Sequence, residues 1–448
     1  MYLSNYIKFK FEMLLKKHIG IKVRKIVGKY YFASCKRAIR KKCAIKGKYG
    51  ILPLISDNSL DNFKSVKKYN DSFLCNKLKS KSQIKIGFVT YTSTTWNVGY
   101  LFDLIRQDSR FKVELIIGHR QAWKKYTCKE YSETISYFSK LGYPIKEADK
   151  MISAKDYDIL FFLSPFPLLE KSINYFCVPL STMILHTSYS YMLVDNSNKV
   201  GIWMYHLAYK YYTDSQFYKF KIENHALYTG NAEFFGFPKM DHFYLADTTK
   251  KIDKIIIIYA PHHSVDCVQF KSSTFDLNYM KFIELAKKYE QSTYWIYKPH
   301  PRLRDTSVRA GIFKDVSEYD DYMDLWRNLP NSEVVTSGDY FSTFLDSDAM
   351  ITDSVSFLAE YQFTHKPLLL LQSGKEQYNE FGNSIVDILY KCSGDDYNSI
   401  ENFIESCINN VDPMFEVRKE FFEKNLDYLS KGEMANKRIY DQIISLIG

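Results

Sequence analysis

The sequence lacks the signals of several familiar protein classes. Its eight cysteines form no C-x-x-C pair and have no regular spacing, so neither a zinc site nor a disulfide framework is indicated, and a reducing cytoplasm fits best. There is no run of about 18 uninterrupted apolar residues, the length that a membrane-spanning helix needs. The N-terminus also lacks an apolar stretch followed by a small-residue cleavage site. We therefore expect neither a membrane span nor a secretory signal.

Common catalytic signatures are missing as well. No G-x-G-x-x-G follows a predicted strand, and the chain contains no Walker A sequence and no H-E-x-x-H. These absences remove the main support for a dinucleotide oxidoreductase, a P-loop NTPase or a zincin protease. Two Asp-x-Asp pairs, beginning at Asp156 and Asp346, could bind a divalent cation, but each precedes a strand and so lies away from a cleft at the strand C-terminal ends. We assign both pairs to turns or caps, and we predict no metal site and no cofactor.

What the chain does have is an uneven distribution of charge. Over all 448 residues the net charge is +10, but residues 1–50 contain fifteen Lys or Arg and a single acid, Glu12. That segment therefore carries +14, and residues 51–448 carry −4. Large apolar residues recur among the lysines at near-helical spacing, at Tyr6, Phe9, Met13, Leu14 and Ile21. The pattern favours a basic amphipathic helix on an anionic membrane surface; nucleic acid is a less favoured partner, and a solvated helical arm is the structural alternative.

Strand-length apolar segments alternate with helix-length segments after residue 82. The hydrophobic content of 46% and the charged content of 25% are those of a soluble globular protein, and the length allows two or three domains. We expect strands over 84–91, 113–119, 158–164, 181–187 and 208–214, and again over 255–261, 293–301, 332–338, 348–353 and 366–372. Alternation of this kind predicts parallel sheets with crossover helices.

The predicted fold class is therefore α/β, with two tandem doubly wound (Rossmann-like) domains and an interdomain cleft. We place a basic N-terminal extension and a polar linker at residues 1–82, the first domain at residues 83–245, and the second domain with closing C-terminal helices at residues 246–448. In such proteins the ligand usually lies in the cleft at the C-terminal ends of the strands.

The segment Asp346–Leu371 predicts one βαβ unit with hydroxyl groups at the entrance of an amphipathic helix. The residues at this entrance are Thr352, Asp353, Ser354, Ser356 and Glu360. A helix N-terminus offers unpaired N–H groups and a partial positive charge, which can bind phosphate together with these hydroxyls. The alternative is that Asp353 or Ser354 only caps the helix.

Histidines end several of the predicted strands. The chain has only ten, and those at or just after a strand end are His186, His262, His263 and His300. Imidazole titrates near neutral pH, so such a histidine can take a proton from an attacking hydroxyl or, when charged, steady a phosphate. Lys298 and Arg302, beside His300, offer phosphate contacts. One such histidine alone would be assigned a structural role; several in a tandem α/β chain favour a functional one.

Five motifs carry a resemblance to a known family. They are Thr352-Asp353 with Ser354, Ser356, Glu360 and Lys366-Pro367; Lys298-Pro299-His300-Pro301; the segment Gly236–Asp241; Tyr259-Ala260-Pro261; and Gly432 with Arg438-Ile439. Together they resemble the CDP-glycerol glycerophosphotransferase family, the teichoic-acid polymerase-like enzymes of GT-B architecture, over residues 180–445. The chain is a divergent case. Where that family has Thr-Trp-Arg after Tyr-Ala-Pro, this chain has His262-His263-Ser264, and where it has His-Gly at a first-domain strand end, this chain has His186-Thr187.

The resemblance implies an inverting, metal-independent transferase that moves a nucleotide-activated group, such as glycerol phosphate from CDP-glycerol, to a surface polysaccharide or lipid-linked acceptor. It implies an acceptor-side first domain with His186 as general base. In the donor-binding second domain, His300 with Lys298 would balance the charge on the donor pyrophosphate. The remaining donor-site residues are Arg302, His262, His263, Thr352, Asp353, Ser354, Ser356 and Glu360.

Other functions stay open at this point. One is a GT-B glycosyltransferase that uses a nucleotide sugar in capsule or lipopolysaccharide synthesis. A second is a non-catalytic scaffold on the membrane surface, and a third is a nucleic-acid binder that uses its basic arm. We expect the protein in the cytoplasm, held peripherally on the inner face of the cell membrane by residues 1–50.

Overall fold

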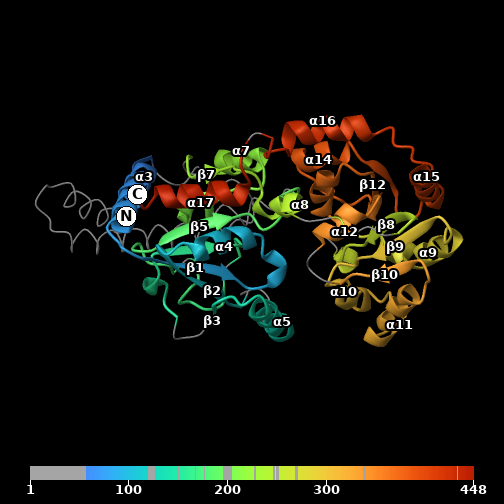
Figure 1. The fold of residues 1–448 in the computed structure, drawn as a ribbon, viewed down its shortest axis with the longest axis horizontal. Helices are drawn as coiled ribbons and strands as arrows, with labels where there is room; N and C mark the ends of the chain where they lie inside the picture. Colours follow the sequence, from blue (N-terminus) through green and yellow to red (C-terminus); the bar gives the residue numbers. More distant parts are fainter. Residues whose placement is uncertain are drawn as a thin grey trace, which may run out of the picture.

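The structure is a computed structural model that describes most of the chain beyond residue 56. The described residues are 57–119, 127–148, 152–166, 168–175, 177–194, 204–226, 229–245, 248, 252–267, 271–336, 340–430 and 432–448. The predicted membrane-binding segment, residues 1–50, lies outside them. Two lobes stand side by side, the first coloured blue to green and the second yellow to orange (Figure 1).

The first lobe is built on a parallel seven-stranded sheet in the order β3-β2-β1-β4-β5-β6-β7. Its strands are β1 (Ile84–Thr90), β2 (Phe111–Ile117), β3 (Ile145–Glu147), β4 (Ile159–Phe162), β5 (Met183–Thr187), β6 (Lys210–Tyr212) and β7 (Ala232–Glu233). Successive residues of β1 point to opposite faces, so Phe88 joins one buried core and Val89 the other. The helices of this lobe are α3 (Asp57–Lys79), α4 (Gly99–Gln107), α5 (Thr127–Lys140), α7 (Gln216–His225) and α17 (Ala435–Ser445).

The second lobe repeats this plan with a six-stranded sheet in the order β10-β9-β8-β11-β12-β13. Its strands are β8 (Ile255–Ala260), β9 (Thr293–Tyr297), β10 (Ser332–Val334), β11 (Ala349–Thr352), β12 (Leu368–Gln372) and β13 (Tyr390–Ser393). Its helices are α9 (Phe275–Lys288), α10 (Leu303–Arg309), α11 (Val316–Arg327), α12 (Phe341–Asp346), α13 (Phe357–Glu360), α14 (Glu380–Val386), α15 (Tyr397–Ile408) and α16 (Phe415–Asn425), and α8 (His242–Leu245) precedes β8. In both sheets the strand order reverses beside the first strand, at β1–β4 and at β8–β11.

The sequence predicted the central strands of both sheets but missed three short strands and one helix. Two tandem doubly wound domains are confirmed, and each of the ten predicted segments contains a strand or overlaps one. Strands β3, β7 and β13 were not predicted, because they have two to four residues and carry few buried side chains. The polar stretch 51–82 was predicted as a linker, yet residues 57–79 form α3, whose Leu74 and Leu78 are buried in the first lobe. Leu74 and Leu78 lie one helical turn apart and so share a face of α3, and the partly buried Phe73 and Cys75 pack against the same core.

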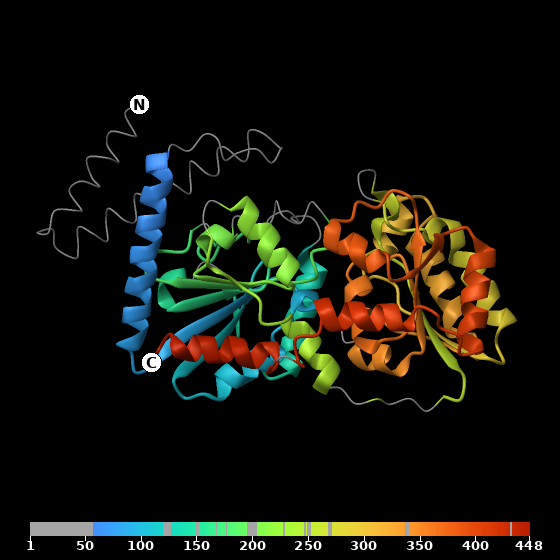
Figure 2. The same cartoon turned by 90° about the horizontal axis from the view of Figure 1, so that it is seen from above.

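The last helix does not stay with the second lobe. The chain leaves α16 and returns to the first lobe, where α17 lies against α4 and ends close to α3 (Figures 1 and 2). Ile439 and Ile443 of α17 share one buried core with Leu74 and Phe102. The predicted second domain, residues 246–448, therefore includes a helix that packs on the first.

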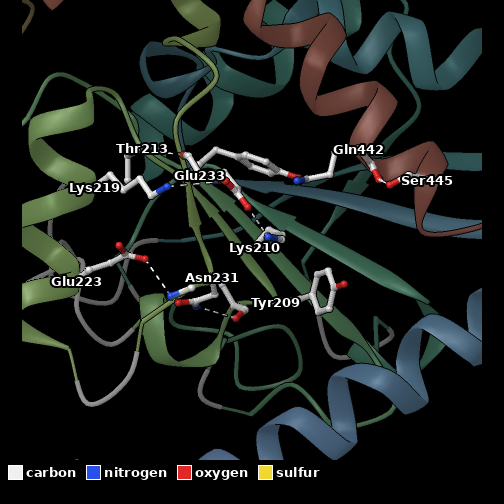
Figure 3. A network of polar contacts seen from close by, with 12 residues as sticks. Tyr209, Lys210, Thr213, Lys219, Glu223, Asn231, Glu233, Gln442 and Ser445 are labelled. Atoms are coloured by element: carbon white, nitrogen blue, oxygen red, sulfur yellow. Dashed lines mark hydrogen bonds and ion pairs between the residues drawn. The ribbon is translucent and has the colours of Figure 1, made fainter.

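Polar contacts reinforce this return. The Tyr212 hydroxyl of β6 donates to Gln442 Oε1 of α17 over 2.7 Å, and nearby Lys210 and Lys219 both point at the Glu233 carboxylate of β7 (Figure 3). The Tyr212 bond ties the first sheet to the last helix, and the Glu233 pairs join β7 to β6 and α7.

A buried carboxylate anchors the start of α17. Asp241 accepts hydrogen bonds from the backbone N–H groups of Ala435 and Asn436, at 3.1 and 2.8 Å, and from the Tyr428 hydroxyl. The Asn436 side-chain amide donates to the same carboxylate over 2.7 Å. Burial raises the pKa of the Asp241 carboxyl, while these donors favour its charged form.

A second connection joins the lobes after β5. The Leu193 carbonyl accepts from the Asn379 backbone N–H over 2.8 Å, and Val194 forms an antiparallel bridge with Tyr378. Tyr191 packs its ring on Phe237, with centroids 5.0 Å apart. The strand-end loop of the first lobe is thus bonded to the second lobe.

Within the described part of the chain, none of the helices has both the length and the apolar character needed to cross a membrane.

The connection between the lobes is closely packed at Gly236. Its φ of +103° favours glycine, and a Cβ atom there would overlap the Tyr428 ring. Gly230 has nearly the same φ, +105°, but has no atom within 4 Å of such a Cβ. We expect Gly230→Ala to cost about 1 kcal/mol through its backbone alone. Gly236→Ala should cost about 1–3 kcal/mol more through the clash.

Thermal unfolding of the two variants beside the unaltered protein measures the difference. Equal losses in Tm for Gly236→Ala and Gly230→Ala would show that Tyr428 does not pack against this position.

Candidate active site

The second lobe gathers the predicted site residues at one edge of its sheet. In open α/β sheets, ligands bind outside the C-terminal strand ends, at the point where the strand order reverses. Strands β8 and β11 lie side by side at that point, and β9 flanks β8. His262 and His263 follow β8, His300 follows β9, and Asp353 follows β11. These residues are distant in sequence, and the strand order alone brings them together.

Asp353 has a different role from the predicted phosphate contact. Its Oδ1 accepts the backbone N–H of His262, and its Oδ2 accepts the Thr274 backbone N–H over 2.6 Å and the Thr274 hydroxyl over 3.2 Å. The side chain is buried, which raises the pKa of its carboxyl to about 6. A carboxylate offers no donor to a phosphate and repels its charge, so here Asp353 positions the loops that follow β8 and precede α9.

The hydroxyls beside Asp353 also differ from the expected helix entrance. The Thr352 hydroxyl donates to the Ala260 carbonyl over 2.6 Å and accepts the Ser354 backbone N–H over 3.0 Å. Helix α13 is only four residues long and continues as a 3-10 turn over Tyr361–Thr364. Ser356 occupies its N-cap position without a side-chain capping bond. The predicted helix is therefore present as two short helical turns between β11 and β12, and its N-cap is Ser356 instead of Asp353 or Ser354.

Three imidazole rings form the centre of the site. The ring centroids of His262 and His263 are 4.3 Å apart, those of His263 and His300 are 4.2 Å apart, and those of His262 and His300 are 5.3 Å apart. One nitrogen from each ring lies within 4.8 Å of the other two, a spacing that a transition-metal ion could use. The sequence predicted each histidine singly and did not predict the cluster.

The partners of the rings favour an anion over a cation. The Arg302 backbone N–H donates to His300 Nδ1 over 3.1 Å, and the Arg302 guanidinium Nη1 lies 3.3 Å from His263 Nε2. Both Arg302 groups can only donate, so these ring nitrogens are acceptors and the ring protons lie on the opposite nitrogens. A metal ion would have to displace Arg302 and its charge, whereas a phosphate would not.

The free site holds the three rings neutral. Burial is the main cause, and it lowers the pKa of His263 to about 4 and places those of His262 and His300 well below the usual range. The rings and the Arg302 guanidinium also repel one another's positive charge.

A second group of charges lies around Tyr340. The ammonium groups of Lys239 and Lys298 stand 4.8 and 5.4 Å from the centre of its ring. The Tyr340 hydroxyl donates to the fully buried Glu360, whose Oε1 is 3.5 Å from Lys239 Nζ. The predicted Lys298 and Glu360 are thus both in contact with Tyr340. Lys239 and Tyr340 were not predicted as site residues, although Lys239 lies in the family-like segment Gly236–Asp241.

His186 lies at the end of β5 in the first lobe. Its Nδ1 is 2.8 Å from the Phe162 carbonyl oxygen, which can only accept, so Nδ1 carries the proton and Nε2 the lone pair. Nε2 has no hydrogen-bond partner among the described residues. The side chain is fully buried against Tyr211, and burial lowers the pKa of His186 to about 3. His186 therefore has the tautomer that a general base needs, but its side chain is shut off from solvent.

Asp214, after β6, is a buried titratable group that was not predicted. Its Oδ1 accepts the Ser215 hydroxyl over 2.8 Å, and its Oδ2 has no hydrogen-bond partner in the described structure. Burial raises the pKa of this carboxyl to about 7. The only signal in the sequence was its place at the end of the predicted strand 208–214.

A sequence model of the CDP-glycerol:poly(glycerophosphate) glycerophosphotransferases matches residues 195–445. The chain belongs to this family. It is therefore an enzyme of the transferase class, and the predicted family is confirmed. The match includes the whole second lobe and all of α17, with every predicted site residue except His186.

Solved structures resemble this glycerophosphotransferase family member in fold. The wall teichoic acid polymerase TagF, in a variant soaked with CDPG, matches with a TM-score of 0.51 and 12% identity over 93% of this chain and 98% of that chain. The UDP-GlcNAc 2-epimerase of Methanocaldococcus jannaschii matches with 0.51 and 10% over 81% and 99%. S. aureus MnaA, in a structure with UDP, matches with 0.50 and 13% over 82% and 98%.

At these identities the likeness concerns the fold alone. The two tandem Rossmann-like lobes of this family member are GT-B-like, as predicted. No curated protein matches the chain.

Asp214 should make the stability of the protein depend on pH. Its raised pKa means that the folded protein keeps this proton up to about pH 7, whereas the unfolded chain releases it near pH 4. The stability that it contributes is complete below about pH 4 and is lost as pH rises through 7. Asp214→Asn stays neutral throughout, so it should gain stability over the unaltered protein with rising pH, by up to roughly 4 kcal/mol.

Thermal unfolding of both proteins at pH 5 and pH 8 measures this gain. A difference in Tm that is the same at both pH values would contradict the assignment.

Proposed function

We propose that this enzyme transfers glycerol phosphate from CDP-glycerol to a surface polysaccharide or lipid-linked acceptor. The observation that carries the proposal is the cluster of His262, His263 and His300 with Arg302 at the point where the second sheet reverses its strand order. Family membership supplies the class of reaction, and an anion site at this position suits the phosphates of a nucleotide donor. The TagF structure soaked with CDPG supports the choice of donor.

In this reaction the second lobe binds the donor, and the first lobe activates the acceptor hydroxyl. In this proposal Lys298 balances the charge on the donor pyrophosphate, and neutral His300 donates a hydrogen bond to it from its protonated ring nitrogen. Ser354 and Ser356 bind its oxygens from the loop after β11. The acceptor hydroxyl loses its proton to His186 Nε2 and attacks the phosphorus that carries glycerol. A new oxygen–phosphorus bond forms, the bond to the bridging oxygen breaks, and CMP leaves with the negative charge.

Access to His186 requires a local opening, because its side chain is fully buried. In this proposal the loop that follows β5 moves, since it directly follows the strand of His186 and is bonded to Asn379 of the second lobe. In this proposal residues 1–50 hold the enzyme on an anionic membrane, where a lipid-linked acceptor lies.

A nucleotide-sugar glycosyltransferase of the same fold is the second candidate. The resemblance to the structure of S. aureus MnaA with UDP favours it, because that fold accommodates a uridine nucleotide. The two candidates differ in the nucleotide that should bind most tightly.

Thermal stabilisation of the full chain separates these candidates. A ligand that binds only the folded state raises Tm according to its concentration relative to Kd. We expect CDP-glycerol and CDP to raise Tm more than UDP, GDP or CMP at equal concentration, with the same result in EDTA, because the site holds phosphate through side chains. Stronger stabilisation by UDP or a UDP-sugar would favour the glycosyltransferase, and loss of binding in EDTA would contradict the metal-independent site.

Replacing each of the two proposed catalytic histidines should affect turnover and donor binding differently. His186→Ala should lower turnover by about 10²–10⁴-fold, the typical contribution of a general base, while CDP-glycerol still binds. His300→Ala should lower turnover and also weaken CDP-glycerol binding, because it removes a phosphate contact.

Initial rates and thermal shifts with CDP-glycerol measure both effects. His365→Asn is a suitable control, because His365 has a φ of +59° that asparagine tolerates, and it precedes β12 at the opposite end of the sheet. Full turnover in His186→Ala or in His300→Ala would contradict its assigned role.

A further inference from the structure

The charges around the histidine cluster are almost all positive. Lys298 and Arg302 come from the loop after β9, and Arg309 of α10 adds a third cation. The Asp266 carboxylate is paired with Arg309 at 2.7 Å. Asp353 bonds to the backbone of His262 and to Thr274. Among the described residues that interact with the rings, no carboxylate is therefore left to balance a charged imidazole, and a bound pyrophosphate would be the missing anion.

The three rings differ in their ability to gain a proton. The basic nitrogens of His300 and His263 already face N–H groups of Arg302, which cannot become acceptors. If either nitrogen were protonated, its hydrogen bond would be lost, because two N–H donors would then face each other. These two rings are therefore fixed in their neutral form by their partner.

His262 has one hydrogen-bond partner, Ser272, that can change from donor to acceptor. Its Nδ1 lies 3.0 Å from the hydroxyl oxygens of both Ser264 and Ser272, which are 2.9 Å from each other. The Ser264 oxygen already accepts the backbone N–H groups of Ser272 and Ser273, at 3.0 and 3.1 Å, so its own proton must be donated. The Ser272 hydroxyl can instead rotate and accept. A proton on His262 Nδ1 would then donate to Ser272 without the loss of a hydrogen bond.

We propose that His262 takes up one proton when the donor pyrophosphate binds, and that the Ser272 hydroxyl turns from donor to acceptor as it does so. This inference rests on the proposed function, because it needs a pyrophosphate in the cluster. The proton comes from solvent and joins Nδ1, so the site gains one positive charge for each donor bound. Donor affinity should then fall as pH rises, by about tenfold per unit between the pKa of His262 in the free enzyme and its higher pKa in the complex.

Calorimetry on the full chain with CDP-glycerol tests the proposal. CDP-glycerol itself does not titrate between about pH 6.5 and about pH 8.5, so any proton taken up belongs to the protein. Heats measured in HEPES and in Tris, which differ in ionisation enthalpy, give the number of protons. We expect about one proton per CDP-glycerol near neutral pH, and a Kd that rises with pH.

Two variants locate the proton. His262→Asn keeps a polar group beside Ser272 but cannot titrate, so it should bind CDP-glycerol without proton uptake and with a Kd that no longer depends on pH. Ser272→Ala removes the acceptor and keeps the ring, so proton uptake should fall and the pH dependence should move to lower pH. His365→Asn should behave as the unaltered protein.

The outcomes separate this inference from the proposed function. CDP-glycerol binding without proton uptake, or uptake that persists in His262→Asn, would overturn the inference and leave the proposed function intact. If His262→Asn does not bind, unchanged uptake in Ser272→Ala overturns the role of the hydroxyl, and reduced uptake supports it. A lack of CDP-glycerol binding at every pH would contradict the proposed function and the inference with it.

Discussion

The buried carboxylate of Asp241 is the contact on which the two-lobed arrangement depends. Donors converge on it from both sides of the second lobe's C-terminal segment: the Tyr428 hydroxyl before α17, and the first two residues of α17 itself. An isolated buried charge would be costly, so the chain must supply all of these donors together. The connection that contains Asp241 also contains Gly236, where the Tyr428 ring packs closely, and Lys239, which pairs with Glu360 of the candidate site. The connection between the lobes thus also contacts the candidate site.

Much of the fold could be predicted from the sequence, since strands buried on both faces are continuous apolar runs, such as ILFF in β4 and LLLL in β12. Strand β7, helix α3 and the path of α17 could not be predicted. Strand β7 is two residues long and exists only because β6 lies beside it, and α3 buries Leu74 and Leu78 against a surface formed by later parts of the chain. The return of α17 to the first lobe likewise depends on tertiary contacts with Asp241, which no local pattern in α17 indicates.

For the candidate site, sequence reasoning named residues that the structure brings together, but it did not predict the contacts that they make. Histidines at strand ends were identifiable one by one, whereas their meeting depends on the sheet order β9-β8-β11. Asp353 was predicted as a phosphate contact, yet its carboxylate is satisfied by His262 and Thr274, a backbone arrangement that a sequence does not display. Asp214 remained unnoticed because a single aspartate after a strand has no motif; only its burial distinguishes it.

The path of α17 has a consequence for how the protein is made. The first lobe's core contains Ile439, Ile443 and Leu446, which leave the ribosome after every strand of the second lobe. Until they emerge, an apolar surface on α4 and β1 has no cover, although most of that lobe was synthesised first. The second lobe has all its strands before α17 and can complete its own sheet earlier. Synthesis therefore runs from the N-terminus, but the lobe begun first is finished last.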